Sequence, residues 1–129
     1  MTRTGRIVLA AGGLAGATGV ALAAVAAHRG GPNLAIAAQM LLVHAAALPA
    51  LAAAAVNVAG SPRVTLAGAG LAGLGTALFA GTLALGDLAG IRPIPMAAPT
   101  GGTLMILGWL VAAAGAFGTR RGDSGGGLR

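Results

Sequence analysis

Residues 34–59 read LAIAAQMLLVHAAALPALAAAAVNVA and contain no charged side chain. A helix needs about 20 apolar residues to cross a hydrocarbon core ~30 Å thick, so this stretch is long enough to span a membrane. Charge is absent from three further stretches of similar length, at residues 7–27, 64–86 and 96–118. The pattern predicts an all-α fold, an integral membrane up-down bundle of four transmembrane helices.

The overall composition agrees with a membrane protein. Only 8% of the 129 residues are charged, against about 25% in an ordinary soluble domain. The net charge of +6 comes from arginines scattered at the ends of the apolar stretches, and aromatic residues make up 2% of the chain. Nucleic acid is therefore not an expected partner, because its binding needs basic stripes and aromatic stacking platforms. The sequence has no cysteine, which excludes disulfides, thiol catalysis and cysteine-ligated metals.

The arginines also predict the orientation in the membrane. Six of the eight lie at the N-terminus, in the turn at Arg63 and at the C-terminus, and only Arg29 and Arg92 lie on the other side. By the positive-inside rule, both termini are expected in the cytoplasm. Residues 1–118 are expected to form one domain, and residues 119–129 a flexible cytoplasmic tail. A cleaved signal peptide is the alternative for the first stretch, but such signals have an apolar core of only about 7–15 residues.

Small residues spaced four apart predict how the helices pack. Lipid tails are as apolar as leucine, so helices in a bilayer associate through close approach at glycine and alanine. Such pairs are found at Gly12 and Gly16, Ala69 and Gly73, Ala77 and Gly81, and Gly108 and Ala112. They are expected to hold the bundle together, and self-association is the alternative use.

Four polar residues are expected at one depth, ~12–15 Å below the non-cytoplasmic ends of the helices. They are Thr18, His44, Thr76 and Trp109. One interpretation is a polar layer that binds a ligand or passes a proton through His44. The other is structural, in which each threonine bonds its own helix and the histidine and tryptophan satisfy each other. Pro49, five residues after His44, is expected to kink or loosen its helix.

A second group of polar residues is expected at the non-cytoplasmic face. It consists of His28, Arg29, Asp87 and Arg92. Asp87 is expected to pair with one of the three cationic side chains, and such an exposed pair contributes about 0–1 kcal/mol. A small external binding site is the alternative. Asn33 is expected to cap the second helix.

The groups that membrane chemistry requires are missing from the spans. No Asp, Glu, Lys, Arg or Ser lies inside any of the four stretches. Proton-coupled cation export relies on an intramembrane carboxylate, and hydrolysis needs a nucleophile with a base. The two histidines lie at different depths, which argues against bis-histidine haem, and ligands for a metal are lacking. We therefore expect neither an enzyme nor a bound cofactor.

The last two stretches carry motifs with a family resemblance. Residues 75–83, GTALFAGTL, and residues 99–102, PTGG, followed by Gly108-Trp109, are similar to paired signatures of a small bacterial membrane family called domain of unknown function 423. His44 with the residues after it, and Ala27-His28, resemble motifs in its first two helices. The family's signature serines and tyrosine correspond here to Ala80, Thr82 and Ala84. The resemblance implies a four-span bacterial inner-membrane protein with no established biochemical activity.

These observations lead to two functional expectations. The first is a small multi-pass plasma-membrane protein that is not an enzyme and acts through helix packing with itself, with lipid or with a partner protein. The alternative is a small channel or carrier that uses the polar layer around His44.

Overall fold

The computed structural model describes residues 3–91 and 94–118, and all of its regular elements are helices. They are α1 (Arg3–Arg29), α2 (Pro32–Asn57), α3 (Pro62–Ala89), α4 (Ala97–Ala114) and the short 3₁₀ helix η1 (Gly115–Phe117). Four of these segments, the last formed by α4 and η1 together, are long and apolar enough to cross a membrane. The expected all-α, four-span membrane fold is confirmed.

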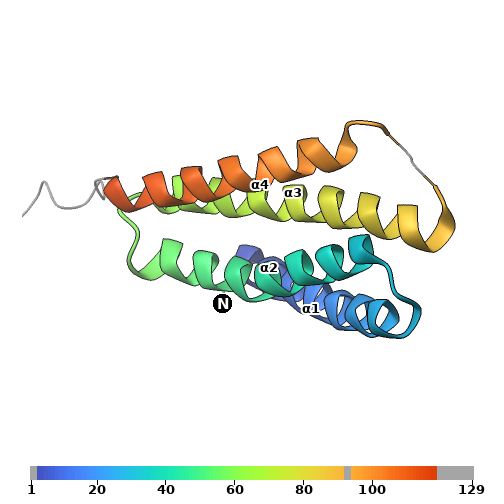
Figure 1. Cartoon of the computed structure of the whole chain (residues 1–129). Helices are drawn as coiled ribbons and strands as arrows, with labels where there is room; N and C mark the ends of the chain where they lie inside the picture. Colours follow the sequence, from blue (N-terminus) through green and yellow to red (C-terminus); the bar gives the residue numbers. More distant parts are fainter. Residues whose placement is uncertain (1–2, 92–93, 119–129) are drawn as a thin grey trace, which may run out of the picture.

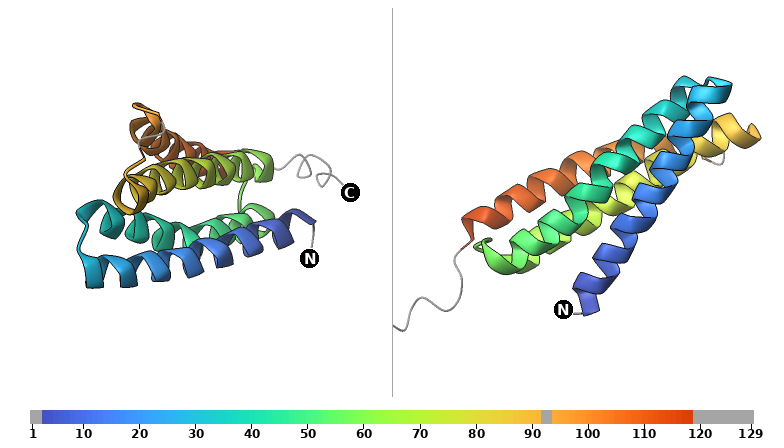
Figure 2. Two further views of the ribbon diagram at one scale, coloured as in Figure 1. Left: turned by 90° about the vertical axis from the view of Figure 1, so that its right-hand side faces the viewer. Right: turned by 90° about the horizontal axis from the view of Figure 1, so that it is seen from below.

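The helices form two antiparallel hairpins, α1 with α2 and α3 with α4, which lie against each other through α2 and α3 (Figure 1). Figure 2 shows the two hairpins as two layers. The α1–α2 and α3–α4 connections lie at one end of the molecule, here called the hairpin end. The start of α1, the α2–α3 turn and the end of α4 lie at the opposite end. The expected tail, residues 119–129, lies outside the described residues.

Glycines end two of the helices. Gly30 and Gly31 follow α1 with φ of 75° and 116°, a backbone region that side chains with a Cβ rarely adopt. Pro32 then opens α2, where its missing N–H costs no helical hydrogen bond. Gly90 ends α3 with φ of 66° and donates its N–H to the carbonyl of Gly86. Local backbone chemistry at these glycines therefore ends α1 and α3 at the hairpin end.

Helices α3 and α4 approach closely because glycines face each other along their contact. A Cβ added to Gly75 would lie 2.6 Å from the carbonyl oxygen of Gly101 and 2.6 Å from the amide nitrogen of Met105. A Cβ on Gly108 would meet the backbone of Ala72. Two backbones can approach this closely only where the residues at the point of contact are very small. Contact through small residues is the usual way in which helices associate in a bilayer.

The α1–α2 contact uses the same chemistry around Pro49. A Cβ on Gly12 would lie 2.8 Å from both the carbonyl oxygen of Ala45 and the Cγ atom of Pro49. Pro49 has no N–H to donate to the Ala45 carbonyl. The expected loosening does not interrupt the helix, since α2 continues through Pro49 to Asn57. Gly12 thus lets α1 cover the carbonyl that Pro49 leaves without its helical donor.

Most of the small-residue pairs pack within the chain, as expected. Gly12 lies against α2, Gly73 against Leu48, and Gly108 against α3. Gly81 differs, because a Cβ there would meet nothing within 4 Å, and Ala77 is exposed. One cluster of buried apolar residues joins α1, α2 and α3 and contains Leu22, Leu34, Ala37, Ala38 and Ala80, and a second joins α2 and α3 through Leu48, Ala69 and Ala72.

Candidate functional site

The His44–Trp109 pair links the two hairpins in the apolar interior. The indole N–H of Trp109, on α4, donates to Nε2 of His44, on α2, across 3.2 Å. Nδ1 of His44 lies 2.9 Å from the carbonyl oxygen of Met40, one turn back on its own helix. The two rings are tilted by 60°, with centroids 6.0 Å apart. His44 is 4% exposed, whereas Trp109 is 41% exposed.

These contacts indicate which ring nitrogen of His44 carries the proton. An indole N–H can only donate, so Nε2 of His44 accepts and carries no proton. Nδ1 then carries the proton and donates it to the Met40 carbonyl. Both ring nitrogens of a neutral imidazole are thereby satisfied. The Trp109 indole, the His44 imidazole and the Met40 carbonyl thus form a short hydrogen-bonded chain.

The two threonines expected at the depth of this pair differ in burial. Thr76 is 3% exposed, and its hydroxyl donates to the carbonyl of Ala72 across 2.8 Å, so it serves its own helix. Thr18 is exposed on α1, whose buried positions are Gly12, Gly19 and Leu22. Helix rotation therefore places Thr18 outside the interior, whereas Thr76 is buried and bonds its own helix, as the structural interpretation expects.

Gln39 stands apart from the other polar residues of the spans. The hydroxyls of Thr65, Thr82 and Thr103 and the amide of Asn57 each donate to a carbonyl four residues back. Gln39 is exposed on α2, and within residues 3–91 and 94–118 its amide has no hydrogen-bond partner. The sequence analysis assigned this residue no role.

Asp87 binds the beginning of α2. Its Oδ1 accepts from the Asn33 side-chain amide across 3.0 Å, and its Oδ2 accepts from the Leu34 backbone N–H across 3.1 Å. The expected pairing with Arg29 or His28 is wrong, because the carboxylate is directed at free N–H groups and at the positive end of a helix dipole. Asn33 is likewise not the cap: Gly31 occupies that position, and Asp87 supplies the acceptor from α3.

The other two described residues of the polar group expected at the non-cytoplasmic face, His28 and Arg29, do not form one cluster with Asp87. Nδ1 of His28 lies 3.0 Å from the carbonyl oxygen of Ala24 on its own helix. Arg29 and Asp87 line one cavity of about 420 Å³ without forming an ion pair. Arg92 lies outside the described residues. The hairpin end thus brings Arg29 and Asp87 together and leaves His28 to its own helix.

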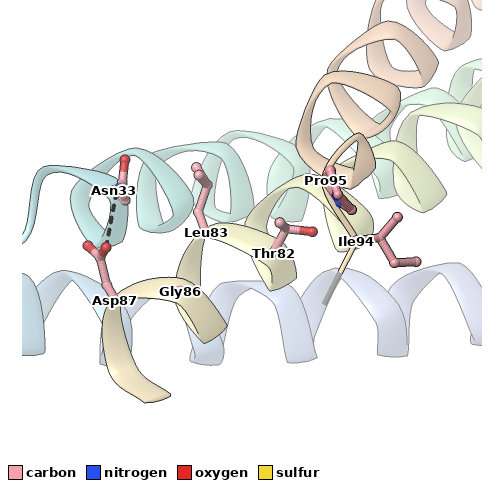
Figure 3. A pocket seen from close by; sticks show the side chains of 7 residues that line it. All are labelled: Asn33, Thr82, Leu83, Gly86, Asp87, Ile94 and Pro95. Atoms are coloured by element: carbon pink, nitrogen blue, oxygen red, sulfur yellow. Dashed lines mark hydrogen bonds between the residues drawn. The ribbon is translucent and has the colours of Figure 1, made fainter. Parts of the chain in front are cut away.

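A further cavity, of about 470 Å³, is also lined by Asp87 (Figure 3). It is lined by the start of α2, the end of α3 and the residues before α4, namely Asn33, Thr82, Leu83, Gly86, Asp87, Ile94 and Pro95. Its polar side chains already have partners, since Asn33 donates to Asp87 and Thr82 donates to Leu78. In the described parts of the chain, no three His, Cys, Asp or Glu residues lie close enough to hold a metal ion.

A family comparison can now be set beside this geometry. The family described as Protein of unknown function (DUF423) matches residues 16–102. The chain belongs to this family. No curated protein and no solved structure matches it. In this DUF423 member, the matched region includes His44, Asp87 and the contact between Gly75 and Gly101, whereas Trp109 lies beyond it.

The contact that Asp87 makes with α2 and the exposed position of Gln39 were not predicted from the sequence of this DUF423 protein. Asp87 was expected to pair with a cationic side chain, and a signal for its contact with α2 exists, because a glycine cap before Pro32 leaves α2 without an acceptor of its own. The outward direction of Gln39 depends on the rotation of α2. No charged or strongly apolar stripe in the sequence fixes that rotation.

Proposed function

We propose that this chain is a non-enzymatic, multi-pass membrane protein that acts by packing against a second copy of itself. The observation that carries the proposal is the exposed Gln39 amide. Helix α2 has 26 residues and measures ~39 Å, about 9 Å more than the hydrocarbon core. Gln39 lies seven residues after Pro32, the first residue of α2. It is therefore about 6 Å inside the hydrocarbon if the helix is centred.

An amide at this depth needs a partner. In hydrocarbon no water satisfies a polar group, and each unsatisfied group costs several kcal/mol. Glutamine side chains in membranes commonly find this partner across a helix–helix contact. The Gln39 amide is both donor and acceptor, so the Gln39 of a second copy is a complete complement in a two-fold arrangement.

The surface around Gln39 suits a close helix contact. Gln39 lines a groove of about 470 Å³ between α1 and α2, with Leu42 and Val43. The remaining lining residues are all alanines, at positions 23, 26, 27, 35 and 38. Small side chains allow another backbone to approach, which strengthens a buried amide–amide bond. Lipid or a different protein would cover the groove without supplying the matching amide in a fixed position.

Cross-linking tests this proposal directly, because the chain has no cysteine of its own. Val43→Cys places a thiol in the groove, where residue 43 is 50% exposed. Leu110→Cys is the matched control on α4, at 62% exposure. Oxidation in native membranes is expected to give a disulfide-linked dimer with Val43→Cys only, and adding Gln39→Leu is expected to remove it. A monomer throughout contradicts self-association, and an adduct of another mass indicates a different partner.

The alternative, a channel or carrier through His44, has less support. A proton relay or ion site needs a nitrogen that is free to exchange, and both nitrogens of His44 are engaged in bonds inside the protein. We expect vesicles containing His44→Leu to show the same ion and proton flux as vesicles containing the unaltered chain. Loss of a flux that the unaltered chain supports would favour the transport alternative.

We also propose the inner, or plasma, membrane of a bacterial cell as the location, with both termini in the cytoplasm. The support is the arginine distribution, in which Arg3 and Arg6 lie in the first turn of α1 and Arg63 lies at the start of α3, both opposite the hairpin end. Reporter fusions at the two ends are expected to give cytoplasmic signals. A periplasmic signal at either end would reverse this assignment.

A further inference from the structure

Two opposite charges share a cavity at the hairpin end without pairing. Arg29, the last residue of α1, and Asp87, near the end of α3, both line the cavity of about 420 Å³ described above. The bonded partners of Asp87 are Asn33 and Leu34, and the Arg29 guanidinium has no partner in the described part of the chain. A ligand with both a cationic and an anionic group can bridge such a gap.

Asp87 is held ready for a donor. A carboxylate offers about four acceptor positions, and the bonds to Asn33 and Leu34 use two of them. These bonds also fix the carboxylate relative to α2. The remaining positions can accept from a cationic N–H group, and charge-assisted hydrogen bonds of this kind are about twice as strong as neutral ones.

An apolar slot continues from the charged cavity. A neighbouring cavity of about 340 Å³ is lined by Ala24, Val25, His28, Arg29 and Leu88. Arg29 and Leu88 line both cavities, so the two adjoin. The pair forms a groove between α1 and α3, with charges at its outer end and apolar side chains below them.

We infer that this groove binds a phospholipid whose zwitterionic headgroup carries a primary ammonium. The ammonium donates to Asp87, the phosphate accepts from Arg29, and the start of an acyl chain lies against Ala24, Val25 and Leu88. Arginine suits the phosphate because its planar fork of N–H groups can bond two oxygens at once. The site lies at the hairpin end, apart from the Gln39 groove, and does not depend on self-association.

The residues that line the two cavities indicate which class of lipid headgroup they can bind. A trimethylammonium group has no N–H donor and is recognised by aromatic faces, but the described residues that line these two cavities include no Phe, Trp or Tyr. A phospholipid with a glycerol headgroup would bond Arg29 through its phosphate but offer Asp87 only neutral hydroxyl groups, without the charge that strengthens a hydrogen bond to a carboxylate. A primary ammonium is the headgroup that satisfies both side chains.

Native mass spectrometry of the full-length protein in detergent tests the inference. The probes are three phospholipids with identical acyl chains and ethanolamine, choline or glycerol headgroups. The ethanolamine lipid is expected to bind about fivefold more tightly than the other two, the scale of one charge-assisted hydrogen bond at a partly exposed site. Asp87→Asn is expected to abolish this preference, because only Asp87 contacts the group in which the three lipids differ. Arg29→Gln is expected to weaken the binding of all three lipids, because each of them carries the phosphate. Arg63→Gln, at the opposite end, is expected to change neither the preference nor the affinity.

Equal binding of the three lipids by the unaltered protein would overturn the inference, as would a preference that survives Asp87→Asn or lipid affinities that are unchanged in Arg29→Gln. Arg29→Gln tests the phosphate contact while both bonds between Asp87 and α2 stay intact. Failure here is distinct from failure of self-association. The lipid preference is expected to persist in Gln39→Leu, whereas the Val43→Cys dimer is expected to persist in Arg29→Gln.

Discussion

Trp109 of one hairpin donates its indole N–H to Nε2 of His44 in the other, and Nδ1 of the same imidazole donates to its own helix. The histidine is therefore an intermediate link between an indole and a backbone carbonyl. A buried chain of this kind specifies how the hairpins align, since interhelical hydrogen bonds in membranes contribute only about 0.6 kcal/mol on average.

A double-mutant cycle is expected to measure this coupling. Trp109→Phe keeps an aromatic ring and removes the donor, and His44→Leu removes the acceptor. The coupling free energy between the two positions should be about 0.6 kcal/mol and no more than about 1.7 kcal/mol. Unfolding in mixed micelles supplies the four free energies. Strictly additive effects would mean that the bond does not contribute to stability.

The glycine contact between α3 and α4 is expected to resist even one added methyl group. Gly75→Ala and Gly101→Ala should each lower the free energy of unfolding by about 1–3 kcal/mol, because each new Cβ meets backbone atoms of the facing helix. Gly81→Ala is the matched control on α3, since a Cβ there meets nothing within 4 Å. Thermal unfolding in detergent measures all three. Equal effects at the three positions would contradict the packing described.

Asp87 is expected to protect the first turn of α2. Asp87→Ala removes both acceptors and should destabilise this helix start by about 1 kcal/mol, the usual effect of losing a helix cap. Amide hydrogen exchange at Leu34 should accelerate more than exchange at Leu48, which lies in the middle of α2. Asn33→Ala serves as the comparison, because it removes the side-chain bond and leaves the Leu34 bond in place. Unchanged exchange at Leu34 in Asp87→Ala would argue against the cap.

Gln39→Leu is expected to separate folding from association. The substitution removes an amide that lacks a partner within the described chain, so the monomer should gain about 1–3 kcal/mol of stability. The same substitution should remove the cross-linked dimer. Val43→Ala is a control that changes the groove without touching a polar group. A destabilised monomer would show that Gln39 has a structural role in the single chain.

The spans could be predicted from the sequence because charge is excluded from hydrocarbon wherever it lies along the chain. The interruptions at Arg29, Arg63 and Asp87 therefore located the three turns to within a few residues of the observed helix ends. The short links gave the antiparallel order, and the glycine spacing indicated which positions allow close contact. The hydrogen bond between His44 and Trp109 was one of the two interpretations that their common depth allowed.

The directions of the polar side chains came only from the tertiary structure. Gln39 and Thr18 are directed outward, and His44 and Thr76 inward, although all four lie in stretches of similar Ala- and Gly-rich composition. In water, apolar side chains mark the buried face of a helix, but in lipid the surroundings are as apolar as the protein interior. The sequence thus determined that four helices cross a membrane, and packing between backbones decided how each helix is rotated and which polar atoms meet.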